Sequence, residues 1–75
     1  MRGSVTKLVT SFGSTWGRIQ PDGETREVFF NAPSLADGIN FLSLEVGQAV
    51  QFDEHTDHTN GSHAENVLLV AALPA

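Results

Sequence analysis

The sequence predicts an all-β fold, a small barrel of five antiparallel strands. Short segments rich in β-branched and aromatic residues are separated by glycines and prolines, and no stretch shows the 3.6-residue period of an amphipathic helix. The chain has 75 residues and no cysteine, so we expect one domain with a thin core and no disulfide. Five strands can close into a barrel and leave few unpaired edges.

The first two strands are expected at residues 3–10 and 15–20, where β-branched residues are frequent and a short polar turn separates the segments. A second turn is expected over residues 20–23. Pro21 occupies its second position and Gly23 its fourth, which is typical of a type I turn because proline presets φ and glycine tolerates positive φ. This pattern predicts a hairpin.

The third strand is expected over residues 26–31, which are strand-forming in composition. Successive side chains of a strand point to opposite faces. Val28 and Phe30 therefore share one face, and Phe29 and Asn31 share the other. The apolar pair predicts which face packs on the core.

The second half of the chain begins with a long connection in which residues 34–37 can form one helical or 3₁₀ turn. The fourth strand is expected over residues 48–53, where apolar and polar residues alternate. A polar loop is expected over residues 54–62. The last segment, residues 64–73, is long enough for a short helix, but its valines favour a fifth strand.

Charge is distributed unevenly along the chain, whose formal net charge is −5. Residues 1–26 contain all four basic residues and two acidic ones, whereas residues 27–75 contain seven acidic residues and no lysine or arginine. Affinity for phosphate backbones depends on lysine and arginine, so we expect poor non-specific binding to nucleic acid, while a local basic face stays compatible with the net charge. No segment predicts a secretion signal or a membrane span, and we expect a soluble cytoplasmic protein.

Six short motifs lie along nearly the whole chain. They are Gly-Ser-Val at residues 3–5, Ser-Thr-Trp-Gly-Arg-Ile at 14–19, Pro-Asp-Gly at 21–23, Glu-Val-Phe-Phe-Asn-Ala at 27–32, Gly-Gln-Ala-Val-Gln-Phe at 47–52 and Ala-Glu-Asn-Val at 64–67. In this order and spacing they resemble the motifs of the bacterial cold-shock domain. The resemblance implies one domain over residues 1–75, a five-stranded OB-fold barrel that binds single-stranded RNA or DNA on an aromatic sheet face.

The resemblance places a nucleic-acid interface on the outward face of the first three strands. Its candidate residues are Lys7, Trp16, Arg18, Phe29 and Asn31, together with Phe41 in the following connection. One base stacked on an aromatic ring contributes on the order of 1–3 kcal/mol. Arg18 can itself stack on a base or contact a phosphate.

Several positions of this face depart from the family pattern. Arg18 stands where the family usually has a second phenylalanine, and Asn31 stands where it usually has a histidine. Lys7 replaces the tryptophan of the first strand if a two-residue insertion lies at residues 11–13; otherwise Phe12 can turn toward the same face. Because aromatic positions are lost, we expect weak, sequence-tolerant binding in the micromolar range or above.

The same residues also have purely structural interpretations. The aromatic side chains can belong to the core, and the ring at position 41 can cap the barrel. The two cations can be ordinary surface charges, and Asn31 can be a hydrogen-bonding residue at a strand end. Strand parity favours exposure of Trp16 and Phe29, because Ile19, Val28 and Phe30 fall on the opposite face.

Histidines and carboxylates gather at residues 53–58, with His63 nearby. His55 and His58 could ligate Zn²⁺, but a hairpin loop lacks the rigid scaffold that fixes tetrahedral geometry, so we interpret the run as a solvated polar loop and expect no metal and no cofactor. The sequence has no cysteine, P-loop or Gly-x-Ser-x-Gly motif, and we expect no enzyme activity.

The function that these observations favour is binding of single-stranded RNA or DNA by a monomer with an RNA-chaperone-like role and no membrane association. The alternative is an OB barrel that has lost nucleic-acid binding and serves as a protein-interaction module, whose acidic second half suits a basic partner. A third interpretation, a translation-factor-like barrel on the ribosome, usually requires more lysine and arginine than four residues.

Overall fold

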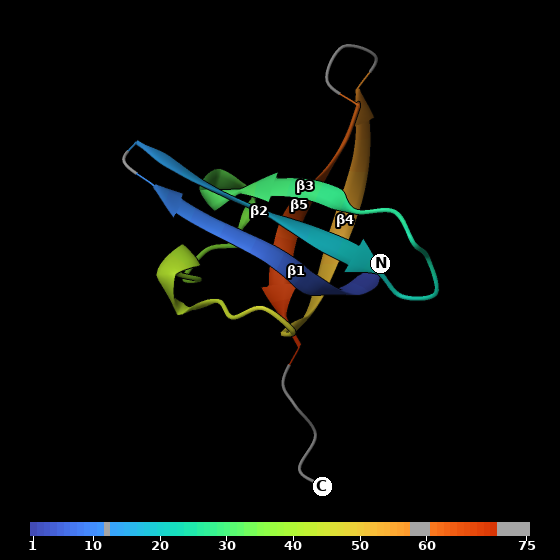
Figure 1. Ribbon diagram of the computed structural model, residues 1–75, viewed down its shortest axis with the longest axis horizontal. Helices are drawn as coiled ribbons and strands as arrows, with labels where there is room; N and C mark the ends of the chain where they lie inside the picture. The colour runs from blue at the N-terminus through green and yellow to red at the C-terminus, as the bar shows by residue number, and fades with distance from the viewer. Residues whose placement is uncertain (12, 58–60, 71–75) are drawn as a thin grey trace, which may run out of the picture.

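A computed structural model describes residues 1–11, 13–57 and 61–70 of the chain. Five strands close a barrel in the order β1-β2-β3-β5-β4 (Figure 1). They are β1 (Arg2–Ser11), β2 (Ser14–Pro21), β3 (Val28–Asn31), β4 (Ala49–Asp57) and β5 (Gly61–Leu69). The predicted five-stranded, all-β barrel is confirmed. Every pair is antiparallel except β3 and β5, which close the barrel in parallel.

Among the described residues, ten buried hydrophobic side chains fill the barrel. They are Val5, Ile19, Val28, Phe30, Phe41, Leu44, Val50, Phe52, Ala64 and Val67. The parity predicted for the third strand is confirmed, since Val28 and Phe30 are fully buried while Phe29 remains 42% exposed. The core face of β3 therefore fixes which side chains the strand offers to solvent.

A β-bulge in β1 changes the parity of the strand. The register with β2 shifts between Val5 and Lys7, so that Thr6 is the extra residue. Val5 is buried and Leu8 packs against the core, while the two residues between them face outward. A bulge re-aims side chains in this way. Lys7 therefore joins the outward face of β2 and β3, which strict alternation from Val5 would not allow.

The turn after β2 lies one residue later than predicted. Strand pairing continues to the end of β2, where Gly3 pairs with Pro21. The backbone N–H of Glu24 donates to the carbonyl oxygen of Pro21 at 3.2 Å, and Gly23 at the third position has a φ of 78°. The prediction that the turn spans residues 20–23 is wrong, because pairing with β1 holds Pro21 within the strand.

Two short 3₁₀ helices lie in the connection between β3 and β4, η1 (Ala32–Ser34) and η2 (Phe41–Ser43). The prediction of a helical turn over residues 34–37 is wrong in its placement, because the 3₁₀ helix η1 ends at Ser34. Asn31 determines where η1 begins, because its side-chain oxygen accepts a 2.7 Å hydrogen bond from the hydroxyl of Ser34. None of the helices in the described part of the chain has the length and apolarity needed to cross a membrane.

The polar loop predicted over residues 54–62 is largely strand instead. Strands β4 and β5 continue as a paired ribbon, in which His55 lies opposite His63 and Thr56 lies opposite Ser62. In Figure 1 this ribbon projects away from the barrel. Polar residues are compatible with it because both faces are solvated while the backbone groups pair. The predicted turn at residues 60 and 61 and the predicted strand end beyond residue 70 include positions outside the described residues.

Candidate nucleic-acid interface

The outward face of β1, β2 and β3 brings together five of the six predicted interface residues. Register places them side by side, because Lys7 is opposite Arg18, Arg18 is opposite Phe29, and Trp16 is opposite Asn31. Phe12, the alternative to Lys7, lies outside the described residues. The short β3 and the bulge in β1 together create this cluster.

Trp16 and Phe29 form an aromatic platform at the centre of the face. Their ring centroids are 5.8 Å apart, with 27° between the ring planes. The two residues are diagonal neighbours on adjacent strands, a distance that aromatic side chains can span. Phe29 is exposed and Trp16 is half-buried. The platform therefore presents π-faces that a base can stack upon.

Two cations flank the platform. The Nζ atom of Lys7 lies 5.5 Å from the centroid of the Trp16 ring, and the Cζ atom of Arg18 lies 5.7 Å from it. Both distances fall within the range of cation–π attraction. The cations therefore stay beside the ring, where they can meet the phosphates of a strand whose bases stack on the platform.

An acidic residue that the sequence analysis did not single out also lies on this face. The Oε1 atom of Glu27 is 3.9 Å from Nη1 of Arg18, and its Oε2 atom accepts a hydrogen bond from the hydroxyl of Thr6. The alternation of side chains along β3 could have indicated Glu27 from the sequence, because this residue is two positions before the exposed Phe29 and shares its face.

Phe41 contradicts its predicted role. Its side chain is only 6% exposed, and its ring packs on Phe30 with 5.8 Å between the centroids. Asn40 caps η2 by accepting a 3.0 Å hydrogen bond from the N–H of Leu42, which starts the helix so that Phe41 points inward. The prediction that Phe41 contacts nucleic acid is wrong, and the structure shows the alternative, a ring that closes the end of the barrel.

Asn31 lies on the face but is engaged in local structure. Besides accepting from the Ser34 hydroxyl, it donates its backbone N–H to Ser34 Oγ at 3.3 Å. These reciprocal contacts hold the start of η1. Its side-chain oxygen is thus committed to the helix, and the strand-end interpretation describes it better than base recognition does.

The family model described as the 'Cold-shock' DNA-binding domain matches residues 1–70. The chain belongs to this family. The barrel is accordingly the OB-fold of a cold-shock domain, and the family is one of nucleic-acid-binding domains and not of enzymes. The comparison with curated proteins finds no significant match.

An open groove of about 670 Å³ continues from the platform of this cold-shock domain. It lies between β3, η1 and β5, and Phe29 forms part of its wall. On the β5 side, Nε2 of His63 is 3.0 Å from Oε1 of Glu65, so the wall is polar and partly acidic. The sequence analysis did not predict this groove, because it depends on the parallel approach of β5 to β3.

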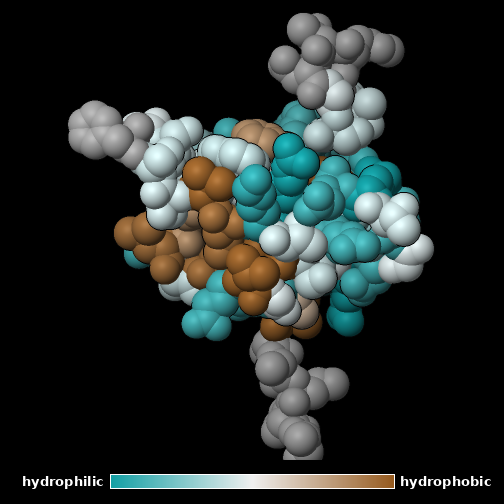
Figure 2. Space-filling model, viewed as in Figure 1, coloured by the Kyte–Doolittle hydropathy of each residue, from teal (hydrophilic) through white to brown (hydrophobic). Residues whose placement is uncertain are grey.

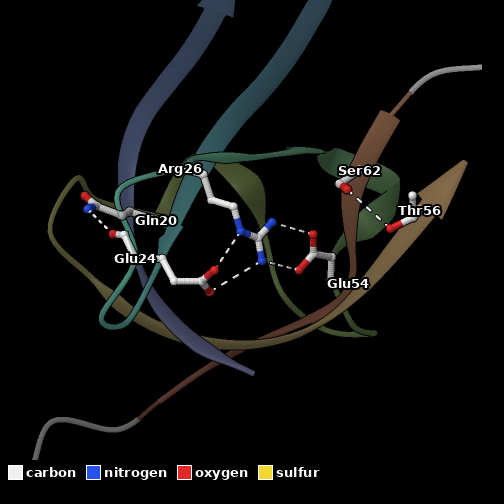
Figure 3. Close-up of polar contacts among 6 residues, drawn as sticks. All are labelled: Gln20, Glu24, Arg26, Glu54, Thr56 and Ser62. Atoms are coloured by element: carbon white, nitrogen blue, oxygen red, sulfur yellow. Dashed lines mark hydrogen bonds and ion pairs between the residues drawn. The ribbon is translucent and has the colours of Figure 1, made fainter.

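Arg26 is not part of the face. Figure 3 shows its guanidinium between two carboxylates, with Nε 2.8 Å from Glu24 and Nη2 2.6 Å from Glu54. These hydrogen bonds raise the pKa of Arg26, and the bond from Arg26 is the main cause that lowers the pKa of Glu54. The arrangement joins the β2–β3 connection to β4. The two carboxylates offset the positive charge of Arg26, so little of that charge is left for a ligand.

The histidine-rich segment also has a structural description. The rings of His55 and His63 lie side by side across the β4–β5 ribbon, with centroids 5.2 Å apart and 58° between their planes. Among the residues that the structure describes, no group of three or more histidines, cysteines, aspartates or glutamates is placed to hold a metal ion. His58 lies outside those residues, so the Zn²⁺ hypothesis is not tested at that position.

Proposed function

We propose that this cold-shock domain binds single-stranded RNA or DNA weakly, with little sequence preference, by stacking bases on the Trp16–Phe29 platform. The observation that carries the proposal is the exposed Phe29 ring against Trp16 with two cations beside it. Stacking is sequence-tolerant because every base has a π-face. The domain needs no cofactor and no catalytic group for this task.

The affinity follows from the number of rings. Two stacks at about 1–3 kcal/mol each give about 2–6 kcal/mol, whereas a micromolar Kd requires roughly 8 kcal/mol. Lys7 and Arg18 are the cations of this face that can add to this value, and the net charge of −5 limits how much they add. We therefore expect a Kd in the micromolar range or above, and a log–log salt slope no steeper than about −1.4 for two neutralised phosphates.

The biological role that we propose is that of a cytoplasmic, monomeric RNA chaperone. Binding to the open strand shifts a weak hairpin toward its unpaired form by RT ln(1 + [protein]/Kd), and no energy source is required. A weak binder is effective only when its concentration exceeds Kd. The role therefore implies an abundant protein.

Intrinsic fluorescence tests the proposal, because Trp16 is the only tryptophan and the chain has no tyrosine. Heptamers of oligo-dT and oligo-dC should quench it saturably at low salt. Phe29→Ala should weaken binding, whereas Leu42→Ala, which removes an exposed apolar side chain outside the platform, should leave binding unchanged. A flat titration up to high micromolar oligonucleotide would contradict the proposal.

A second candidate function, a protein-interaction module, is favoured by exposed apolar side chains. Leu42 is 74% exposed and Val46 is 63% exposed. Figure 2 shows hydrophobic residues gathered on the side of the molecule where β1 and η2 lie in Figure 1. Exposed apolar patches often mark protein contacts. Loss of oligonucleotide binding would leave this function as the better account of the domain.

A further inference from the structure

The carboxylate of Glu27 contacts residues of two strands of the interface, Thr6 in β1 and Arg18 in β2. Its Oε2 atom accepts a hydrogen bond from the hydroxyl of Thr6 in β1, and its Oε1 atom lies 3.9 Å from Nη1 of Arg18 in β2. The same hydroxyl lies 3.3 Å from the carbonyl oxygen of Arg18. Glu27 itself immediately precedes β3.

Alternation along β1 places Thr6 on the outward face, opposite to the buried Val5. The register shift between Val5 and Lys7 turns Lys7 to that face as well, beside Thr6. Thr6 can then reach across β2 to the start of β3. The carboxylate is thereby fixed on the same face as the platform, a short distance from the cation that flanks Trp16.

A carboxylate and a phosphate compete for the same guanidinium group. Both present a pair of oxygens that matches the arginine fork, and a carboxylate 3.9 Å from Nη1 offsets the positive charge that would attract a phosphate. Arg18 lies 5.7 Å from the Trp16 ring centroid, close enough to reach the phosphate of a nucleotide stacked on that ring. A strand that uses Arg18 must therefore displace Glu27 or tolerate its negative charge.

We propose that Glu27, positioned by Thr6, is an internal competitor that keeps the backbone phosphate away from Arg18. The inference rests on the proposed binding of single strands to the platform. In this role Glu27 limits the affinity for nucleic acid. The domain then recognises a nucleic-acid strand mainly by base stacking, and it relies on Lys7 for contact with the phosphate backbone. Its partner class is therefore unpaired strands with accessible bases, and the phosphates of a duplex bind poorly.

The decisive variant is Glu27→Gln, which removes the charge and keeps an oxygen that can accept from Thr6. We expect oligo-dT binding to tighten about fivefold or more at low salt, with a log–log salt slope steeper by about 0.7 because one more phosphate is neutralised. Glu45→Gln is the matched control. It makes the same change in net charge at an exposed position in the connection before β4 and should change neither the affinity nor the slope by as much.

Two further variants separate competition at Arg18 from a general loss of negative charge. Arg18→Ala in the Glu27→Gln background should remove the gain down to the level of the control. Thr6→Val keeps the charge of Glu27 and removes the bond that positions it, so it should give an intermediate gain. Thermal unfolding of each variant verifies that the barrel is intact.

The outcomes distinguish this inference from the function on which it rests. If the wild type binds and Glu27→Gln binds equally to Glu45→Gln, or more weakly, the competitor role is overturned and the proposed function stands. If the gain survives in the double variant with Arg18→Ala, the role assigned to Arg18 is overturned. If no variant binds any oligonucleotide, both proposals are wrong.

Discussion

Replacing Gly17 with alanine should destabilise the barrel, although alanine in place of glycine usually has the opposite effect where φ is ordinary. Gly17 lies in β2 between Leu8 of β1 and Phe30 of β3. A Cβ atom here would lie 2.5 Å from the carbonyl oxygen of Lys7 and 2.8 Å and 2.9 Å from two ring carbons of Phe30. The position thus has no room for a methyl group.

Two opposing effects set the magnitude. Restricting the unfolded chain by a change from glycine to alanine stabilises a protein by about 0.4–1 kcal/mol. Overpacking a filled core costs about 1–3 kcal/mol. The Phe30 ring is fully buried and the other obstacle is backbone, so neither can move cheaply. Overpacking therefore prevails, and we expect a net loss of about 1–2 kcal/mol, or about 5–15 °C in Tm for a domain of this size.

Thermal unfolding followed by far-ultraviolet circular dichroism measures this loss without relying on the neighbouring Trp16. Thr15→Ala is the control, because residue 15 lies in the same strand but is exposed, and surface changes usually stay within about 0.5 kcal/mol. A Tm for Gly17→Ala equal to or above that of the wild type would refute the packing argument. It would also mean that β2 and β3 can separate locally without cost.

Three further predictions concern ligand binding, the core and pH. Phe29→Ala should raise the Kd for oligo-dT by roughly 5- to 150-fold, the equivalent of one lost stack, while fluorescence titration and an unchanged Tm show that the fold is kept. Phe41→Leu should lower the Tm and leave the Kd for oligo-dT unchanged, because this ring is in the core. A higher Kd for this variant would show that Phe41 belongs to the interface. Because Arg26 lowers the pKa of Glu54, their pairing contributes stability at pH values above the ordinary carboxyl pKa of 4.5, and this contribution is lost as the pH falls through the lower, folded-state pKa. Arg26→Gln should therefore reduce the difference in Tm between pH 7 and pH 3, and an equal difference would contradict the assignment.

The alternation of apolar and polar residues was sufficient to predict the strands whose side chains alternate regularly. Val28 and Phe30 identify the core face of β3, and that parity alone exposes Phe29. The resemblance to the cold-shock family supplied what parity cannot, the outward position of Lys7. Strict alternation from Val5 would bury that lysine, and only the bulge at Thr6 corrects the register.

The errors concern residues whose environment is set by distant parts of the chain. Phe41 follows a connection with no regular pattern, and its burial depends on packing against Phe30, which is far away in sequence. The β4–β5 ribbon is polar on both faces, so hydrophobic periodicity gives no signal for it, although cross-strand pairs such as His55 and His63 hold its register. The position of Glu27 follows from the parity of β3, but its contacts with Thr6 and Arg18 depend on how β1 and β2 pair.

The parallel closure of the barrel joins β3 to β5 at a single paired position, Phe29 with His63. A strand stacked on Phe29 and continuing into the groove toward His63 would lie across this seam. Such a ligand would bind only the closed barrel, and so would stabilise closure by the free energy of its own binding. Amide hydrogen exchange in β3 would then slow when oligonucleotide is added. The bound nucleic acid would stabilise the pairing between β3 and β5, which rests on one pair of residues.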